Sequence, residues 1–194
     1  MEKVSYALGL SLGNNLSQSG ISELNYSKLA QGIQDVLEGN KPEISYQEAQ
    51  TIINEFFQTL QSEMNGKNIE EGKAFLSENA KRDGVIILPS GLQYEVMTEG
   101  NGAKPKATDT VEVHYHGSLI DGSVFDSSVN RGEPATFGVT QVIPGWVEAL
   151  QLMPVGSKWK LFIPSDLAYG AQGAGQAIAP HATLVFEVEL LDIK

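Results

Sequence analysis

The sequence contains no cysteine, and this absence removes several kinds of chemistry. Without thiols the chain forms no disulfides, has no thiolate nucleophile and offers no sulfur ligands to zinc or an iron–sulfur cluster. No segment approaches the roughly 18 consecutive apolar residues that a membrane-spanning helix needs. Positive charge is scarce as well, since 24 acidic residues outnumber 13 basic ones and give a net charge of −11. We therefore expect neither nucleic acid nor a membrane as a partner.

The amino-terminal segment lacks the features of a signal peptide. Residues 1–15, MEKVSYALGLSLGNN, contain no basic head, no continuous apolar stretch and no small-residue cleavage site. A cytoplasmic location is the simplest expectation. The alternative is a periplasmic protein that has lost its signal peptide and gained Met1.

Familiar catalytic and metal-binding motifs are also missing. The one G-x-S-x-G segment, GLSLG (9–13), lies inside a predicted helix and not on the tight strand-to-helix turn that exposes a serine nucleophile. His114 and His116 share one side of a predicted strand, as two metal ligands would, but no third ligand follows at a typical spacing. The segment GAQGAG (170–175) lacks the Lys-Ser/Thr that ends a phosphate-binding loop, so it is more typical of a flexible flap. We predict no metal and no cofactor.

Proline divides the chain into two parts. Residues 1–84 contain one proline and residues 85–194 contain the other seven. The first part has the apolar spacing of helices. A first helix carries Val4, Leu8, Leu12 and Leu16, and a second carries Leu29, Ile33, Val36 and Leu37 and stops at Gly39.

A third helix has the clearest start, because Ser45 and Glu48 form the S-x-x-E capping box. Its apolar pattern weakens at Gly66 and resumes until about residue 83. An unbroken helix would measure about 57 Å. One interpretation is a three-helix domain with a flexible linker. We favour a homodimer, because two short helices and half a long one supply too little core to fold alone. The later part of the third helix would then lead to a second domain.

The second part has the pattern of strands and turns. In VEVHYHGSL (111–119) apolar and polar residues alternate, and Asp121-Gly122 is typical of a hairpin turn. A short helix is predicted at 146–151, headed by Trp146. The fold class is therefore α+β, with an amino-terminal all-helical region followed by an antiparallel sheet wrapped around one short helix.

Six of the nine aromatic residues in this second part gather near predicted strand ends and turns: Tyr115, Phe125, Phe137, Trp146, Tyr169 and Phe186. An ordinary β-sheet core is one explanation. A small apolar pocket with Trp146 as its floor is the other.

Four motifs carry a family resemblance: VHYHGSLIDGSVFDSS, VIPGWVEALQLMPVGSKWKLFIP, LAYG and PHATLVFEVELL. They resemble the FKBP-type peptidyl-prolyl cis-trans isomerases. The segment SYALGLSLG, the long third helix and SGLQYEV resemble the dimerisation region of the bacterial macrophage-infectivity-potentiator and FklB-like branch. This resemblance implies a helical dimerisation domain at 1–65, a continuing helix at 66–85 and an isomerase domain at 86–194.

The family's pocket maps onto eleven residues of this sequence. The resemblance implies catalytic roles for Tyr115, Phe125, Asp126, Phe137, Trp146, Tyr169 and Phe186, and substrate binding by Arg131, Val142, Ile143 and Ile178. Two departures from many eukaryotic members, Ala135 and Ala174, affect the contacts expected for inhibitors.

The implied activity is faster rotation of X-Pro bonds in folding polypeptides, through desolvation in an apolar pocket. The resemblance also implies chaperone-like binding of unfolded, proline-containing clients by a V-shaped homodimer, and binding of rapamycin-type macrolide inhibitors. The alternative is a chaperone or binding module with little catalysis.

Overall fold

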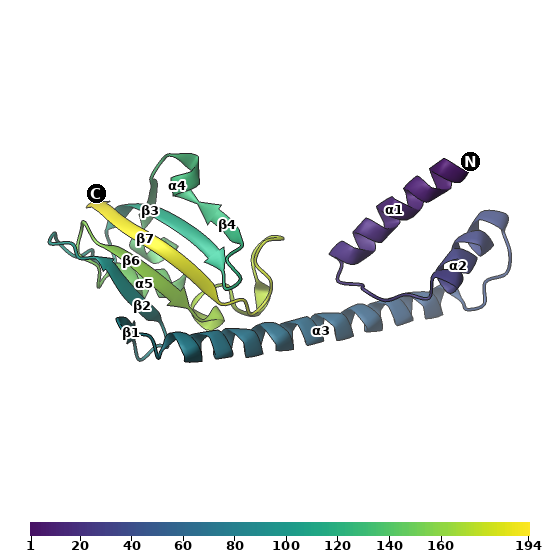
Figure 1. Cartoon of the computed structure of the whole chain (residues 1–194), viewed down its shortest axis with the longest axis horizontal. Coiled ribbons are helices and arrows are strands. Elements are labelled where there is room, and N and C mark those ends of the chain that lie inside the picture. Colours follow the sequence, from purple (N-terminus) through teal and green to yellow (C-terminus); the bar gives the residue numbers. More distant parts are fainter. The chain divides into compact units, whose positions relative to one another are not determined.

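A computed structural model describes all 194 residues, which form two compact units, residues 1–62 and 63–194. Figure 1 shows the elements of each unit. One helix, α3 (Tyr46–Asn79), contributes residues to both. No helix combines the length and the hydrophobicity of a membrane span.

The first unit consists of α1 (Glu2–Gln18), α2 (Tyr26–Glu38) and the beginning of α3. Asn25 caps α2 by accepting a hydrogen bond from the Lys28 N–H at 3.0 Å, and α2 ends at Gly39 with a φ of 71°. The Ser45 hydroxyl accepts from the Glu48 N–H at 3.1 Å, which confirms the predicted start of the third helix. α3 then continues without interruption through Gly66 for 34 residues.

This first unit has no buried residue. The apolar side chains predicted to form helix stripes lie in the open, including Leu8 at 66%, Val36 at 60% and Phe56 at 45% exposure. Gly9 and Gly13 have no atoms within 4 Å of where a Cβ would sit. A helical segment that leaves its apolar stripes in water lacks the burial that stabilises a domain.

The second unit is built on a seven-stranded antiparallel sheet in the order β1-β2-β6-β7-β3-β4, with β5 also pairing with β3. Its strands are β1 (Val85–Ile87), β2 (Gln93–Thr98), β3 (Thr110–Leu119), β4 (Val124–Ser127), β5 (Ala135–Gly138), β6 (Lys158–Ile163) and β7 (Leu184–Ile193). The connections contain α4 (Ser128–Arg131), α5 (Pro144–Leu150) and three 3-10 turns, η1 (Val139–Gln141), η2 (Ser165–Leu167) and η3 (Gly170–Gln172).

The strands curve around α5, and the predicted fold class is confirmed (Figure 1). Every second residue of β3 from Val111 to Gly117 is buried, as the alternation predicted. The hairpin between β3 and β4 turns at Gly122, whose φ is 88°. The core packs Trp146, Ala149 and Leu150 of α5 against residues of β3, β6 and β7.

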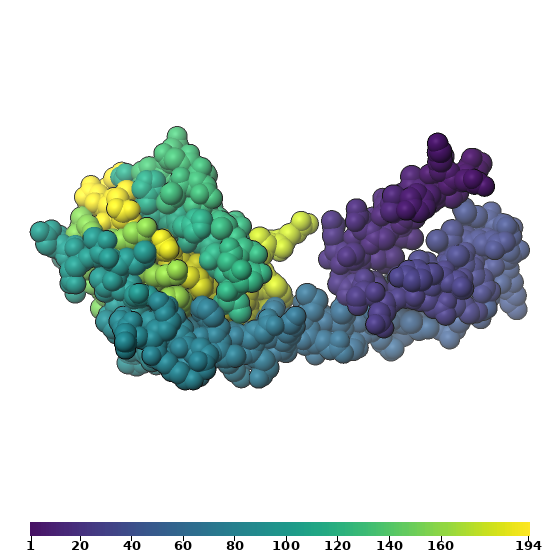
Figure 2. Space-filling model, viewed as in Figure 1, coloured from purple at the N-terminus to yellow at the C-terminus, as the bar shows by residue number.

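The carboxyl-terminal part of α3 packs on the outer side of this sheet. Phe75 lies 6.1 Å from Phe162 between ring centroids. The buried Asn79 donates to the Gln93 side chain at 2.8 Å, and that amide donates to the Leu76 carbonyl at 3.0 Å. Figure 2 shows the atoms of this part of α3 in contact with the sheet. The helix ends at Asn79, a few residues before the predicted end at residue 83.

Candidate active site

A cavity of about 670 Å³ opens on the inner face of the sheet. Ten of the eleven predicted site residues line it: Tyr115, Phe125, Asp126, Phe137, Val142, Ile143, Trp146, Tyr169, Ile178 and Phe186. The eleventh, Arg131, lies beside the cavity and contacts two of its residues. The cavity is therefore mainly aromatic and aliphatic, with one charged edge.

The indole of Trp146 forms the floor. Ile143 precedes α5 and Pro144 opens it, so the preset φ of proline starts the helix directly after the sheet. Gly145 lets the helix approach β6, because a Cβ there would sit 2.6 Å from Ile163 Cγ2. Trp146 is 4% exposed, and its Nε1 is buried without a hydrogen-bond partner.

Aromatic rings surround this indole edge-on. The ring centroids of Tyr115, Phe137 and Phe186 lie 5.5, 6.0 and 5.2 Å from that of Trp146. Edge-to-face pairs of this kind contribute about 0.5–1.5 kcal/mol each beyond their buried area. Gly117 makes room for the side wall, because a Cβ there would sit 2.7 Å from both Phe125 and Phe186. The wall is closely packed and apolar.

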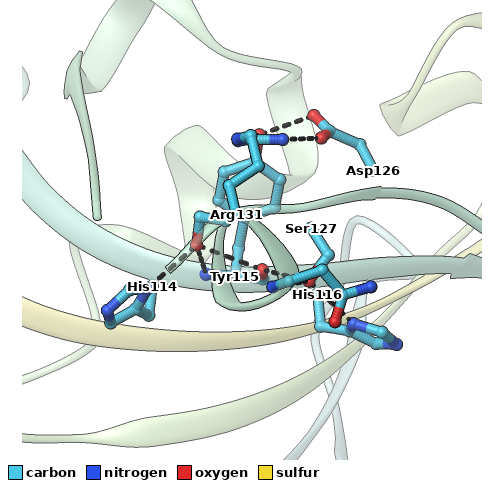
Figure 3. A network of polar contacts seen from close by, with 8 residues as sticks. His114, Tyr115, His116, Asp126, Ser127 and Arg131 are labelled. Carbon is cyan, nitrogen blue, oxygen red and sulfur yellow. Dashed lines mark hydrogen bonds and ion pairs between the residues drawn. The ribbon is translucent and has the colours of Figure 1, made fainter. Parts of the chain in front are cut away.

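The polar edge consists of Tyr115, Asp126 and Arg131 (Figure 3). The Tyr115 hydroxyl donates to Asp126 Oδ2 at 2.5 Å and accepts from Arg131 Nη2 at 2.8 Å. Arg131 Nη1 also pairs with Asp126 Oδ1. The guanidinium carbon lies 5.5 Å from the centre of the Tyr115 ring. Each member of this triad is held by the other two.

These contacts determine the charge of the edge. Burial alone would raise the pKa of Asp126, but the hydrogen bonds from Tyr115 and Arg131 and the Arg131 charge outweigh burial and hold that pKa below its ordinary value. Burial raises the pKa of the Tyr115 hydroxyl, and its hydrogen bond to Asp126 adds to the rise. At neutral pH the edge therefore presents a carboxylate and a neutral phenol.

The two histidines of β3 lie on the other side of the strand from Tyr115 (Figure 3). His114 Nδ1 lies 3.1 Å from the hydroxyl of Ser128, and His116 Nδ1 lies 2.9 Å from that of Ser127. Ser128 also accepts from the Tyr115 N–H at 2.7 Å. Both histidines are half-buried and tie β3 to the start of α4.

The rim of the cavity offers two free polar groups. The Ile143 N–H has no acceptor within the chain, because Ile143 precedes the first residue of α5. Tyr169 also lines the cavity and is 39% exposed, and its hydroxyl has no hydrogen-bond partner within the chain. Both groups can reach the carbonyls of a bound peptide.

Four further residues line the cavity: Gln141, Ala174, Gly175 and Ala177. Ala174 was expected to affect inhibitor contacts, but no chemical signal in the sequence marks Gln141, Gly175 or Ala177, which are one neutral amide and two small residues. Position was the only clue to these three, because each lies within a few residues of a predicted site residue.

Such a cavity, aromatic and without a nucleophile paired to a base, is typical of proteins that change a substrate by its environment rather than by covalent chemistry. Two family models match the chain. One, described as FKBP-type peptidyl-prolyl cis-trans isomerase, covers residues 101–191. The other, described as the domain amino terminal to that isomerase, covers residues 1–96. The chain belongs to the FKBP-type peptidyl-prolyl cis-trans isomerases.

Individual relatives agree with this assignment. The FKBP-type 22 kDa peptidyl-prolyl cis-trans isomerase of Escherichia coli K12 is 51% identical, over 98% of this chain and 94% of its own length. The outer membrane protein MIP of Legionella longbeachae is 46% identical, over 100% of this chain and 85% of its own. The crystal structure of FkpA from Escherichia coli superimposes with a TM-score of 0.81 at 40% identity, over 99% of this chain and 95% of that one.

The protein is therefore an isomerase of prolyl peptide bonds, and its substrates are proline-containing polypeptides. This confirms the family and the activity that the sequence motifs implied. The relatives do not support the expected cytoplasmic location, and the name of the Legionella protein fits the alternative of a cell-envelope compartment.

Proposed function

We propose that the cavity above Trp146 is the site of X-Pro isomerisation, and that its residues act by holding the proline ring in a dry environment. The observation that carries this assignment is the convergence of ten predicted residues on one apolar cavity. The seven residues predicted as catalytic, six aromatic and one acidic, would touch the reacting amide. Val142, Ile143 and Ile178 would bind the parts of the peptide on either side of it.

The reaction needs no covalent intermediate. Rotation about a peptide bond breaks amide resonance, with a barrier of about 18–20 kcal/mol. The planar amide has a large dipole, which decreases as the bond twists, so water stabilises the planar form more than the twisted one. An aromatic cavity removes this preference and lowers the barrier relative to water. Trp146, Phe137 and Phe186 provide that environment.

Polar groups at the rim orient the substrate. The free Ile143 N–H and the Tyr169 hydroxyl donate to the carbonyls that flank the rotating bond. Asp126 is already held by Tyr115 and Arg131, and its pKa is lowered, so it shapes the wall and does not serve as a base. Arg131 keeps Asp126 and Tyr115 in place.

The two tryptophans of the chain provide the test. Trp146 lines the cavity, whereas Trp159 is equally buried, at 6% exposure, and stacks on Tyr94 outside it. We expect Trp146→Leu to lower kcat/KM for a short X-Pro peptide by about tenfold or more, equivalent to about 1.4 kcal/mol. Trp159→Leu should keep most of the rate while both variants lose stability. Equal rates for the two variants would place the reaction elsewhere.

We also propose that residues 1–65 form a homodimer that captures unfolded clients and that residues 86–194 carry catalysis. Residues 66–85 connect the two, as helix up to Asn79. The dimer is supported by the absence of buried residues in the first unit, where exposed apolar side chains need a partner surface. Two pockets in one dimer would bind an extended client more tightly than one.

Rapamycin-type macrolides would occupy the same cavity and compete with substrate. Ala174 lines it and Ala135 lies on the adjoining strand β5, so both departures affect the contacts available to such ligands. For the cellular location we propose the cell envelope, on the name of the Legionella relative.

A further inference from the structure

One wall of the cavity is a loop that protrudes from the second unit. Residues 170–180, here called the flap, carry Ile178 into the cavity, where it is 7% exposed. Figure 2 shows the flap projecting from the surface in yellow-green. Within it, Ala174 and Ile178 exchange two backbone hydrogen bonds of 2.8 and 3.1 Å. These bonds shape the tip but do not attach it to the sheet.

The base of the flap needs a separate anchor. The His181 N–H donates to the Gly170 carbonyl at 2.8 Å and closes the loop. His181 has a φ of 60°, and it is the only residue other than glycine with a positive φ. Such a conformation costs free energy unless the surrounding structure holds it. The carbonyl just before it, that of Pro180, has no backbone partner.

That anchor comes from α3. Asn68 Nδ2 donates to the Pro180 carbonyl at 2.8 Å, across 112 positions of sequence. One turn later, Gly72 allows the helix to come close, because a Cβ there would sit 2.4 Å from the Thr183 hydroxyl. Thr183 is itself buried, at 5% exposure. Figure 1 shows the loop beside α3. α3 therefore contacts Pro180 at the base of the flap and Thr183 just after it.

We propose that Asn68 is a positioning residue for substrate binding: by holding the Pro180 carbonyl, it keeps Ile178 in the cavity. This inference rests on the proposed function of the cavity. Asn68 does not line the cavity and acts only through the flap.

The hydrogen bond from Asn68 to the Pro180 carbonyl is called the tether below. Its loss should weaken peptide binding more than it slows rotation of the X-Pro bond. A freed flap also adopts conformations in which Ile178 has left the cavity. The apparent affinity for the peptide then falls in proportion to the fraction of molecules that can still bind it. Ground state and transition state both need the wall, so KM rises while kcat changes little.

The variant Asn68→Asp tests this in the full-length protein, because the aspartate carboxylate has the shape of the amide but no N–H to donate to the Pro180 carbonyl. We expect KM for a short X-Pro peptide to rise by about three- to tenfold with kcat nearly unchanged. The amide protons of Ile178 and His181 should exchange faster, whereas those of the core strand β7 should not. A general loss of structure would speed both.

Asn54→Asp is the matched control, since Asn54 is an exposed residue of the same helix whose side-chain amide hydrogen-bonds only to Gln50. It should leave KM and exchange unchanged. Ile178→Ala gives a second comparison: adding Asn68→Asp to it should raise KM little further, because the tether acts through Ile178.

Three results would overturn the tether: an unchanged KM, an equal rise in KM with and without Ile178, or faster exchange throughout β7. Trp146→Leu measured alongside separates the two proposals. If it loses activity while Asn68→Asp does not, only the tether fails. If both retain full activity, the cavity is not the site.

Discussion

The charged edge of the cavity depends on three side chains that satisfy one another. Asp126 accepts from both Tyr115 and Arg131, and neither donor has a second carboxylate within reach. The lowered pKa of Asp126 results from these donors acting against burial. A group whose pKa is depressed on folding stabilises the structure above its unfolded pKa, about 3.9 for aspartate, and loses that effect as the pH falls through the folded pKa.

At the residue scale we therefore predict that Arg131 sets the pH at which kcat/KM falls on the acid side, here called the acid limb. The kcat/KM of the unmodified protein should hold down to about pH 5 and fall only below about pH 4, as Asp126 takes up a proton. In Arg131→Ala one of the lowering contacts is gone, so the limb should move to higher pH. Peptide isomerisation measured between pH 3.5 and 7, with circular dichroism to monitor folding, checks this.

Asp121 is the control for this prediction. Its pKa is also lowered, by a hydrogen bond from the Ser123 N–H in the β3–β4 turn, but it does not line the cavity. Asp121→Asn should leave the acid limb of activity in place. An unshifted limb in Arg131→Ala would mean that a different group controls the acid side.

At the scale of elements, α3 is a structural part of the isomerase unit. Gln93 on β2 is 6% exposed, and both its side-chain partners, Asn79 and the Leu76 carbonyl, belong to the helix. Phe75 lies close to Phe162 on β6. Removing the helix would remove both hydrogen bonds of the Gln93 amide, worth about 0.5–1.5 kcal/mol each, and would expose the ring of Phe162, which is now 2% exposed.

We predict that a fragment of residues 63–194 folds and isomerises a short peptide at the rate of the full chain. A fragment of residues 86–194 should unfold at lower urea concentration, with a loss of about 3 kcal/mol or more from the amide and the apolar surface together. Urea titrations of the two fragments give the comparison. Matching midpoints would show that the helix adds nothing to the sheet.

The contrast between these elements shows what the sequence could predict. The cap at Ser45, the hairpin at Gly122 and the alternation of β3 follow from residues a few positions apart, and all three are present. The contact between Asn68 and Pro180 spans 112 positions and has no local signature. The bond of Asn79, the last residue of α3, to Gln93 on β2 likewise has no local signature.

The residues of the candidate site also divide into those that the sequence could predict and those that it could not. Its aromatic members stood out because tryptophan and phenylalanine are unusual at strand ends and turns, and the family motifs placed the remainder. Small residues such as Gly175 and Ala177 reach the cavity only because the flap folds over it, which no spacing rule predicts. Gly117 is essential for packing, yet its role is visible only when Phe125 and Phe186 meet across it.

At the scale of the whole molecule, the first unit leaves a large apolar surface exposed. Residues 1–62 include no buried side chain, while Leu8, Leu12 and Ile33 are 66%, 36% and 44% exposed. Gly9 and Gly13 beside this stripe leave space for another backbone. Apolar faces of this extent are typical of protein interfaces, and a second copy of this helical unit offers the same faces in return.

We therefore predict that the chain is a dimer and that Leu8→Asp with Leu12→Asp dissociates it. A charge brought into an apolar interface stays unpaired and strongly opposes association. The dimer dissociation constant from sedimentation equilibrium should rise by about a hundredfold or more, equivalent to about 2.7 kcal/mol. Asn14→Asp adds the same charge to an exposed position on the opposite face of the same helix and should leave the dimer intact. The dissociated variant should still isomerise a short peptide but protect a refolding protein less well, because two linked pockets are lost. A leucine variant that stays dimeric would show that these helices face solvent and that the interface lies elsewhere.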